Sequence, residues 1–110
     1  RANIRLSGRD VYVATVGGMK MSEPAADLAA ALAIASAAKG LALPADLVAL
    51  GEVGLAGEIR KISGVKRRLE EAFRLGFKRA LVPTGSDIKI VGMEIVEVNR
   101  IETAISKVKL

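Results

Sequence analysis

Serine and lysine are the side chains in this sequence with which covalent chemistry could be done, because the chain contains no cysteine and no histidine. A serine becomes a nucleophile when a base lies within roughly 3 Å and an oxyanion hole is already in place. The candidates are Ser22, Ser36 and Ser63, with Lys20 or Lys66 as the base. Ser22 and Ser63 stand where helix caps are expected, and Ser36 is a small residue within a predicted helix. We therefore expect no catalytic residue and no metal site in this chain.

Contact with a polyanion is the second kind of chemistry that the sequence indicates. Residues 60–79, the basic window, carry eight basic side chains against Glu70 and Glu71, a net charge of +6. The whole chain has a net charge of +5, so the other 90 residues sum to −1. A concentrated positive face is typical of proteins that bind polyanions. A solvated helix face with two strand ends explains the same cluster, and both explanations stay open.

Length and composition predict a single globular domain over residues 1–110. The chain is 51% hydrophobic and 26% charged, which is ordinary for a globular protein large enough to bury one core. Its longest apolar stretch, residues 28–38, ends at Lys39 after 11 residues, fewer than the roughly 18 that a membrane span needs. The lack of cysteine excludes disulfides, and we find no secretory leader, so we expect a cytoplasmic protein with no membrane contact.

The first half of the chain predicts a strand followed by a small, apolar helix. Residues 10–16 are rich in β-branched side chains and close at Gly17, which indicates a strand running into a tight turn. Ser22 can cap a helix that starts at Glu23, has hardly a polar side chain over residues 25–38 and ends at Gly40. Because this helix is apolar nearly all round, we expect it in the protein interior.

The middle of the chain predicts a strand, a hairpin and an amphipathic helix. Residues 46–50 read as the strand, and the glycines of residues 51–62 permit a hairpin. Ser63 can cap a helix over residues 64–75, which Gly76 terminates. Apolar residues recur on this helix at the spacing of a stripe that faces the core, namely Val65, Leu69, Ala72 and Phe73. Arg68 borders the stripe and can pair with Glu71.

The last part of the chain predicts two more strands and a closing helix. Residues 79–83 form a short strand ended by a proline, and residues 94–98 form an alternating strand. Asn99 can cap a helix over residues 100–107. Strands that alternate with helices predict an α/β sandwich, an α+β arrangement of helices packed on a sheet.

Three motifs carry a resemblance to a known family. They are Glu23-Pro-Ala-Ala-Asp-Leu28, Gly51-Glu-Val-Gly-Leu-Ala-Gly-Glu-Ile-Arg60 and Leu75-Gly-Phe-Lys-Arg-Ala-Leu-Val-Pro83. In this order and at these distances, the sequence resembles the C-terminal domain of bacterial RadA from about Asp10 to Leu110. That family is similar to the proteolytic domain of Lon peptidases, so the resemblance implies a Lon-like fold. The sequence departs from the family at Lys61, where proline is expected, and at Val65-Lys66, where the family tends to have Gln-Glu.

The resemblance also implies that the peptidase chemistry is lost, which makes the domain catalytically degenerate. The Ser-Lys dyad of Lon peptidases falls on Ala25 and Arg68 of this sequence. Ala25 has no hydroxyl, and a guanidinium with a pKa above about 12 stays protonated and cannot accept a proton. A residual Ser/Lys peptidase is the weakest of the alternatives.

For function, the resemblance implies a part in recombinational DNA repair and branch migration. Few aromatic residues are present for stacking on bases, so contact would be with phosphates of single- or double-stranded DNA, largely independent of sequence. The residues that match basic positions of the family are Lys20, Arg60 and Arg68, followed by Arg67, Arg74 and Arg79.

The resemblance implies assembly as well, and leaves open a purely structural role. Members of the family are expected to form homo-hexameric rings, in which this domain would be a scaffold without DNA contact. Acidic Glu52, Glu58 and Glu94 would then meet basic Arg74, Lys78 or Arg79 of the next subunit. A RecA-like ATPase and a zinc-binding segment would precede the domain in a longer protein. We expect ATP, Mg and Zn to bind to those preceding parts, and no cofactor to bind to this domain. The RecA recombinase is a possible partner.

Overall fold

The computed structural model describes residues 24–108 of the chain, so the predicted strand over residues 10–16 and the candidates Lys20 and Ser22 lie outside the described residues. In chain order its elements are η2 (Pro24–Ala26), α2 (Asp27–Lys39), β1 (Leu47–Ala49), β2 (Glu52–Val53), β3 (Ile59–Arg60), α3 (Val65–Arg74), β4 (Arg79–Pro83), β5 (Glu94–Val98) and α4 (Ile101–Lys107). Strands alternate with helices, as predicted. No helix of the described part is long and apolar enough to cross a membrane.

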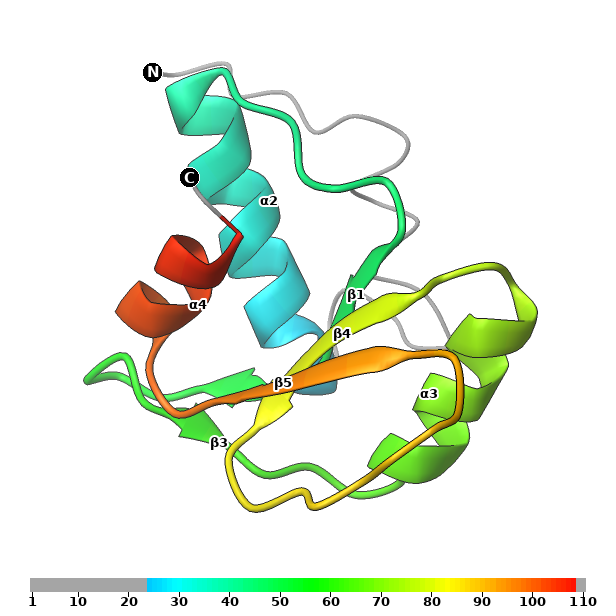
Figure 1. Ribbon diagram of the computed structural model, residues 1–110. Coiled ribbons are helices and arrows are strands. Elements are labelled where there is room, and N and C mark those ends of the chain that lie inside the picture. The colour runs from blue at the N-terminus through cyan, green and yellow to red at the C-terminus, as the bar shows by residue number, and fades with distance from the viewer. Residues whose placement is uncertain (1–23, 109–110) are drawn as a thin grey trace.

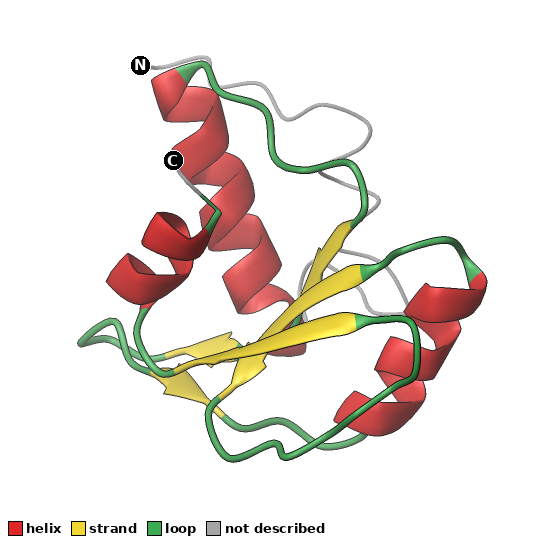
Figure 2. Ribbon diagram, viewed as in Figure 1, coloured by secondary structure: helices red, strands yellow, loops and turns green. Residues whose placement is uncertain are grey.

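A three-stranded parallel sheet forms the centre of the molecule. Its strand order is β1-β4-β5, with Val48 opposite Ala80 and Ala80 opposite Ile95. Figure 1 shows α2 and α4 next to each other on one side of this sheet and α3 on the other side, and Figure 2 shows the same layers by element type. Because helices cover it, β1 is an uninterrupted apolar run that is buried along its length. The α/β fold class predicted from the sequence is confirmed.

Helix α2 is less enclosed than its composition suggests. Its buried residues form one face, Leu28, Ala29, Leu32, Ala33 and Ser36. Ile34 points away from that face and is 51% exposed, so the expected position in the protein interior holds for one face of the helix only. Because alanine side chains are small, α2 can lie close to its neighbours on its buried face, and its opposite face need not be buried. Gly40 ends the helix as predicted, because its φ of 67° is a left-handed conformation that glycine adopts without strain.

The β2–β3 hairpin is attached to the molecule at both of its ends. At its base, the Gly51 N–H donates to the Ala25 carbonyl at 3.1 Å, and the Leu28 N–H donates to the Gly51 carbonyl at 3.0 Å. Near its far end, the Ile101 N–H at the start of α4 donates to the Gly57 carbonyl at 2.8 Å. The predicted hairpin over residues 51–62 is therefore confirmed, and it joins the start of α2 to the start of α4.

The predicted serine and asparagine caps of the later helices were wrong. Gly64, with a φ of 72°, is the N-cap residue of α3 in place of Ser63, and no side chain caps that helix. Arg100 is the N-cap residue of α4 in place of Asn99, again without a side-chain cap. The Asn99 carbonyl instead accepts the Ile59 N–H at 2.9 Å, so this residue holds the hairpin.

The predicted core-facing stripe of α3 is largely confirmed. Val65, Leu69 and Ala72 are buried, while Phe73 is 36% exposed and lies at the edge of the core. Its ring lies over Gly92, where an added Cβ would stand 3.0 Å from the ring carbon Cζ. Phe73 therefore packs on the loop before β5 rather than beneath the sheet.

The connection between β4 and β5 crosses between parallel strands without a helix. One carboxylate holds its first part, because Glu97 accepts the Gly85 N–H at 3.0 Å and the Asp87 N–H at 2.8 Å. These two donors, with a smaller contribution from the charge of Lys61, lower the pKa of the Glu97 carboxyl below its ordinary value of 4.5. We call residues 84–93 the crossover loop.

We predict that the buried face of α2, and not its exposed face, determines stability. Leu28→Ala removes a fully buried side chain and should lower the free energy of unfolding by about 2–5 kcal/mol. Ile34→Ala, the matched control on the same helix, should cost less than about 1 kcal/mol. Urea unfolding followed by circular dichroism measures both values. Equal losses in the two variants would contradict the assignment of faces.

We also predict that Glu97 stabilises the fold in a pH-dependent way. A carboxyl whose folded pKa lies below 4.5 adds stability that is present above that pH and is lost as the pH falls through the folded pKa. Glu97→Gln should therefore unfold at lower urea concentration than the unaltered chain at about pH 7, and the difference should shrink towards about pH 3. A difference that is constant over this range would show that the carboxylate charge does not matter.

Candidate nucleic-acid interface

The two positions on which the resemblance places the Ser-Lys dyad lie in different surroundings. Ala25 is 8% exposed within the core, and Arg68 is half-buried on α3. Of the candidate serines, Ser36 is buried and its hydroxyl donates to the Leu41 carbonyl, a bond that closes the end of α2. Ser63 is exposed in the segment before α3. A structural role thus accounts for the Ser36 hydroxyl, and the absence of catalysis stays a prediction.

Helix α3 presents its basic residues to solvent because its apolar stripe is buried. Lys66, Arg67 and Arg74 lie off the stripe and are exposed. Among the described residues, neither Lys66 nor Arg67 takes part in an ion pair. The guanidinium groups of Arg67 and Arg68 lie back over Gly64, since a Cβ added there would be 3.6 Å from Arg67 Nη2 and 3.9 Å from Arg68 Nε.

Lys61 lies beside the first turn of α3. It lines a shallow pocket of about 240 Å³ together with Val65 of that turn and Gly85 of the crossover loop. Lys61 is exposed, and no acidic group within residues 24–108 forms an ion pair with it. We call the surface formed by Lys61, Lys66 and Arg67 the α3 basic surface.

Arg60, one of the lead candidates from the sequence, is held by a neighbouring acid. Its Nε and Nη2 atoms donate to Glu58 Oε2 at 3.1 Å and 2.7 Å. Glu58 also accepts the Ala56 N–H at 3.2 Å, so the carboxylate is fixed by the hairpin backbone as well. The hydrogen bonds from Arg60 lower the pKa of Glu58, and the same contact raises the pKa of Arg60.

Arg74 and Arg79 are also partnered, and they lie at the other end of α3. Arg74 Nη2 contacts Glu71 Oε1 at 2.5 Å, one turn back on the same helix. Arg79 Nε contacts Asp46 Oδ1 at 3.2 Å across the β1–β4 edge. Both pairs are exposed, so each partner screens the charge that the arginine shows to solvent.

The structure does not gather the predicted DNA-contacting residues in one place. Arg60, Arg67 and Arg68 lie within nine consecutive residues that lead into α3, whereas Arg74 ends α3 and Arg79 begins β4. Lys20 lies outside the described residues. Lys61 and Lys66 were counted in the basic window but were not named among the predicted DNA contacts. The distance of Lys66 from the apolar stripe was the signal that could have identified it.

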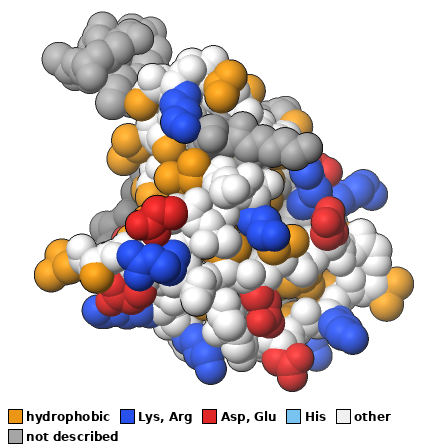
Figure 3. All heavy atoms as spheres, turned by 60° about the vertical axis from the view of Figure 1, so that its left-hand side comes forward, with side chains coloured by type: hydrophobic (Ala, Val, Ile, Leu, Met, Phe, Trp, Pro, Cys, Tyr) orange, Lys and Arg blue, Asp and Glu red, His pale blue; other side chains and the backbone are white. Residues whose placement is uncertain are grey.

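The opposite side of the molecule has a mixed charge. Figure 3, which brings the side with α2, α4 and the hairpin forward, shows basic and acidic side chains interspersed there. Arg100 contributes to this mixture, since its Nε contacts Glu102 Oε1 at 3.2 Å. Within residues 24–108, no group of three or more acidic, histidine or cysteine side chains could hold a metal ion.

The chain matches a known protein family over most of its length. A protein-family model described as subunit ChlI of Mg-chelatase matches residues 13–86. The chain belongs to this family. The matched residues include the hairpin and α3 and end at Ser86, within the crossover loop.

Curated proteins named DNA repair protein RadA are similar to nearly the whole chain. The RadA of Mycolicibacterium smegmatis is 45% identical over 109 residues, which cover 99% of this chain and 23% of that protein. The RadA of Aquifex aeolicus is 50% identical and that of Escherichia coli 44%, each over 94% of this chain and 23% of the relative. The resemblance to proteins named RadA is thus confirmed, and the chain spans about a quarter of their length. The Lon-like type of fold stays a prediction.

Proposed function

We propose that this chain is a domain of a DNA repair protein and that it contacts DNA phosphates through the α3 basic surface. The repair role is supported by relatives named DNA repair protein RadA, which match 94–99% of this chain. Phosphate contact is supported by one observation above all. Lys61, Lys66 and Arg67 are exposed at one end of α3 and form no ion pair with the described residues.

The chemistry of this surface favours phosphates over bases. Phe77 is 5% exposed and Phe73 packs on the crossover loop, so the two described aromatic side chains offer no platform on which bases could stack. Lysine and arginine contacts to phosphates are largely independent of sequence and weaken as salt rises, because binding releases counterions from the DNA.

Arg60 joins this surface when its ion pair opens. An exposed pair such as Arg60–Glu58 contributes little to stability, because solvent screens both charges. Two oxygens of a phosphate can accept two N–H bonds from a guanidinium, as a carboxylate does, so a phosphate can replace Glu58 at little cost. Arg60 thereby extends the α3 basic surface towards the hairpin.

Assembly is the second function that we propose, and catalysis is not among them. The proposed scaffold role, within a homo-hexameric ring, is favoured by the hairpin, whose turn projects from the surface with an apolar tip. We propose no peptidase activity, since Ala25 carries no hydroxyl at the position implied by the resemblance to Lon peptidases. ATP hydrolysis and any contact with a recombinase belong, in this proposal, to the longer protein of which the chain would be part.

We predict that DNA binding depends on where the positive charges lie and not on their number. Lys66→Gln with Arg67→Gln should weaken binding to a fluorescent duplex and lower the slope of log affinity against log salt by about 1 per residue removed. Lys39→Gln with Lys107→Gln is the matched control, because it removes two exposed cations from the ends of α2 and α4. Fluorescence anisotropy across a salt series measures both slopes.

The control pair should leave the salt slope close to that of the unaltered chain. Equal losses in the two double variants would show that binding follows net charge alone, and no binding at low salt would overturn the proposed DNA contact. Light scattering on the same samples shows whether either variant has changed its oligomeric state.

We further predict that Glu58 limits DNA binding by holding Arg60. Glu58→Gln removes the charge that holds Arg60 and should therefore tighten duplex binding at low salt. Glu102→Gln changes the charge equally at the neighbouring Arg100–Glu102 pair and should have a smaller effect. Anisotropy titrations compare the two variants, and a larger gain for Glu102→Gln would place the contact elsewhere.

A further inference from the structure

The turn between β2 and β3 presents an apolar side chain on a rigid support. Leu55 is fully exposed there. The Gly54 N–H donates to the Glu58 carbonyl at 2.8 Å and closes the turn. Arg100 Nη2 donates to the Ala56 carbonyl at 2.6 Å, which ties the turn to the start of α4. Because these bonds already fix the backbone, little conformational entropy would be lost when a partner covers Leu55.

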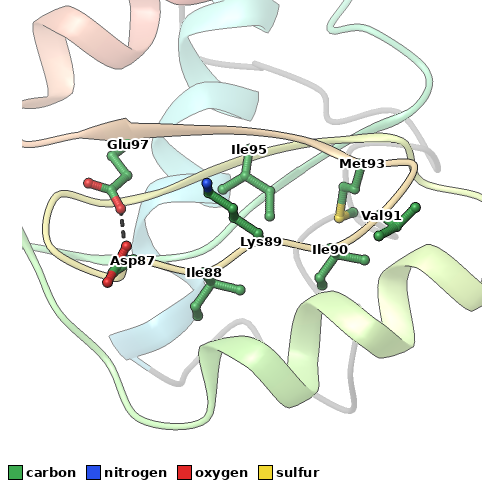
Figure 4. Close-up of a pocket in the computed structure, with 8 residues that line it drawn as sticks. All are labelled: Asp87, Ile88, Lys89, Ile90, Val91, Met93, Ile95 and Glu97. Carbon is green, nitrogen blue, oxygen red and sulfur yellow. Dashed lines mark hydrogen bonds between the residues drawn. The ribbon is translucent and has the colours of Figure 1, made fainter.

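A groove that is apolar, like the hairpin tip, lies along the crossover loop. Its volume is about 510 Å³, and its lining is mainly apolar. Figure 4 shows the side chains that line it, Ile88, Ile90, Val91, Met93 and Ile95, with Lys89, Asp87 and Glu97. Val91 is 96% exposed and adjoins the other apolar side chains of this lining, so a docked group could cover it together with them. The groove therefore has the features of a docking site for an apolar group.

The two features lie at opposite ends of the molecule. In Figure 1 the hairpin turn projects at the left, while the crossover loop runs along the bottom and meets β5 at the right. Leu55 therefore does not reach the groove of its own chain. A contact between the tip of one copy and the groove of the next uses two different patches, and such head-to-tail contacts build closed rings or open filaments.

Charge favours the same pairing. The end of the molecule that carries the hairpin has a net charge of −1, from Glu52, Glu58 and Glu102 against Arg60 and Arg100. The side with α3 and the crossover loop has a net charge of +3, from Lys61, Lys66, Arg67, Arg68, Arg74, Lys78 and Lys89 against Glu70, Glu71, Asp87 and Glu97. Unlike charges steer the two ends together, whereas two like ends repel each other.

We propose that Leu55 at the hairpin tip of one copy of this chain docks into the crossover-loop groove of a second copy. The inference deepens the proposed scaffold role and rests on it, but it does not depend on DNA contact. None of Lys61, Lys66 and Arg67 lines the groove, so a docked copy leaves the α3 basic surface open. The contact would add copies head to tail, with the phosphate-binding surface repeated on each.

Cysteine pairing tests the contact directly, because the chain has no cysteine of its own. Leu55→Cys and Val91→Cys variants are prepared separately, one of them tagged, then mixed and oxidised with a copper–phenanthroline catalyst. The mixture should give a disulfide-linked heterodimer on a non-reducing gel. The control mixture replaces Leu55→Cys with Leu41→Cys, a residue that is half-exposed at the end of α2, away from both features. Equal heterodimer yields in the two mixtures would overturn the proposal.

A second measurement uses a variant that should fold normally, since Leu55 touches solvent only. Leu55→Ser should weaken self-association in sedimentation velocity by about tenfold or more, as expected for loss of a central apolar anchor. Leu41→Ser should leave it unchanged. A chain that stays monomeric at every concentration, or a Leu55→Ser variant that associates like the unaltered chain, would show that another protein segment or nothing fills the groove.

The same variants separate this inference from the proposed DNA contact. Leu55→Ser should bind duplex DNA with an unchanged salt slope, because it removes no cation. Loss of self-association with intact DNA binding supports the docking contact, whereas intact self-association in the Lys66→Gln, Arg67→Gln variant with loss of DNA binding supports the phosphate contact. Each proposal can therefore fail while the other stands.

Discussion

The close approach at Gly51 is the constraint on which the rest of the structure depends. Its N–H and carbonyl bond to Ala25 and Leu28 at the start of α2, so the hairpin begins directly on that helix. A Cβ at position 51 would stand 2.9 Å from Ile59 Cγ2 and 3.6 Å from a Pro83 ring carbon. Only glycine lets the hairpin, α2 and the end of β4 meet at one point. The position of the hairpin sets those of Arg60 and of the segment that leads into α3.

This contact also shows that the packing around Ala25 does not depend on the side chain at that position. The segment around Ala25 and the segment around Gly51 hold each other through backbone bonds, which require no particular side chain at position 25. Asp27 adds a further link, because its Oδ2 atom accepts the Val53 N–H at 3.1 Å. The packing of helix, hairpin and sheet is therefore independent of any nucleophile, and the functional surface is free to lie elsewhere.

The sequence predicted the elements well where local chemistry decides, and less well where tertiary contacts decide. Periodicity and punctuation by glycine and proline located every described helix and strand, and the buried stripe of α3 followed from spacing alone. Both predicted caps lie one residue before the observed N-cap residues, Gly64 and Arg100, whose backbone conformations start the helices without a side-chain cap. The bond from the Ile59 N–H to the Asn99 carbonyl is a contact that separation along the chain hides. The ion pair of Arg79 was equally hidden, because Asp46 is 33 residues from its partner. The pairs of Arg60 with Glu58 and of Arg74 with Glu71 are local, and their spacing of two and three residues was visible in the sequence. Counting charges located the basic window, but it did not show which members of the window form ion pairs.

The most direct test of the central claim is to map the DNA contact residue by residue. Amide resonances of the isotopically labelled chain would be followed by NMR while a short duplex is added at low salt and then competed away with added salt. We predict shifts that are largest over residues 60–67, that reverse with salt, and that are small along α2 and α4. Shifts that are absent, or centred on the hairpin turn or on α4, would contradict the assignment of the α3 basic surface to phosphate binding.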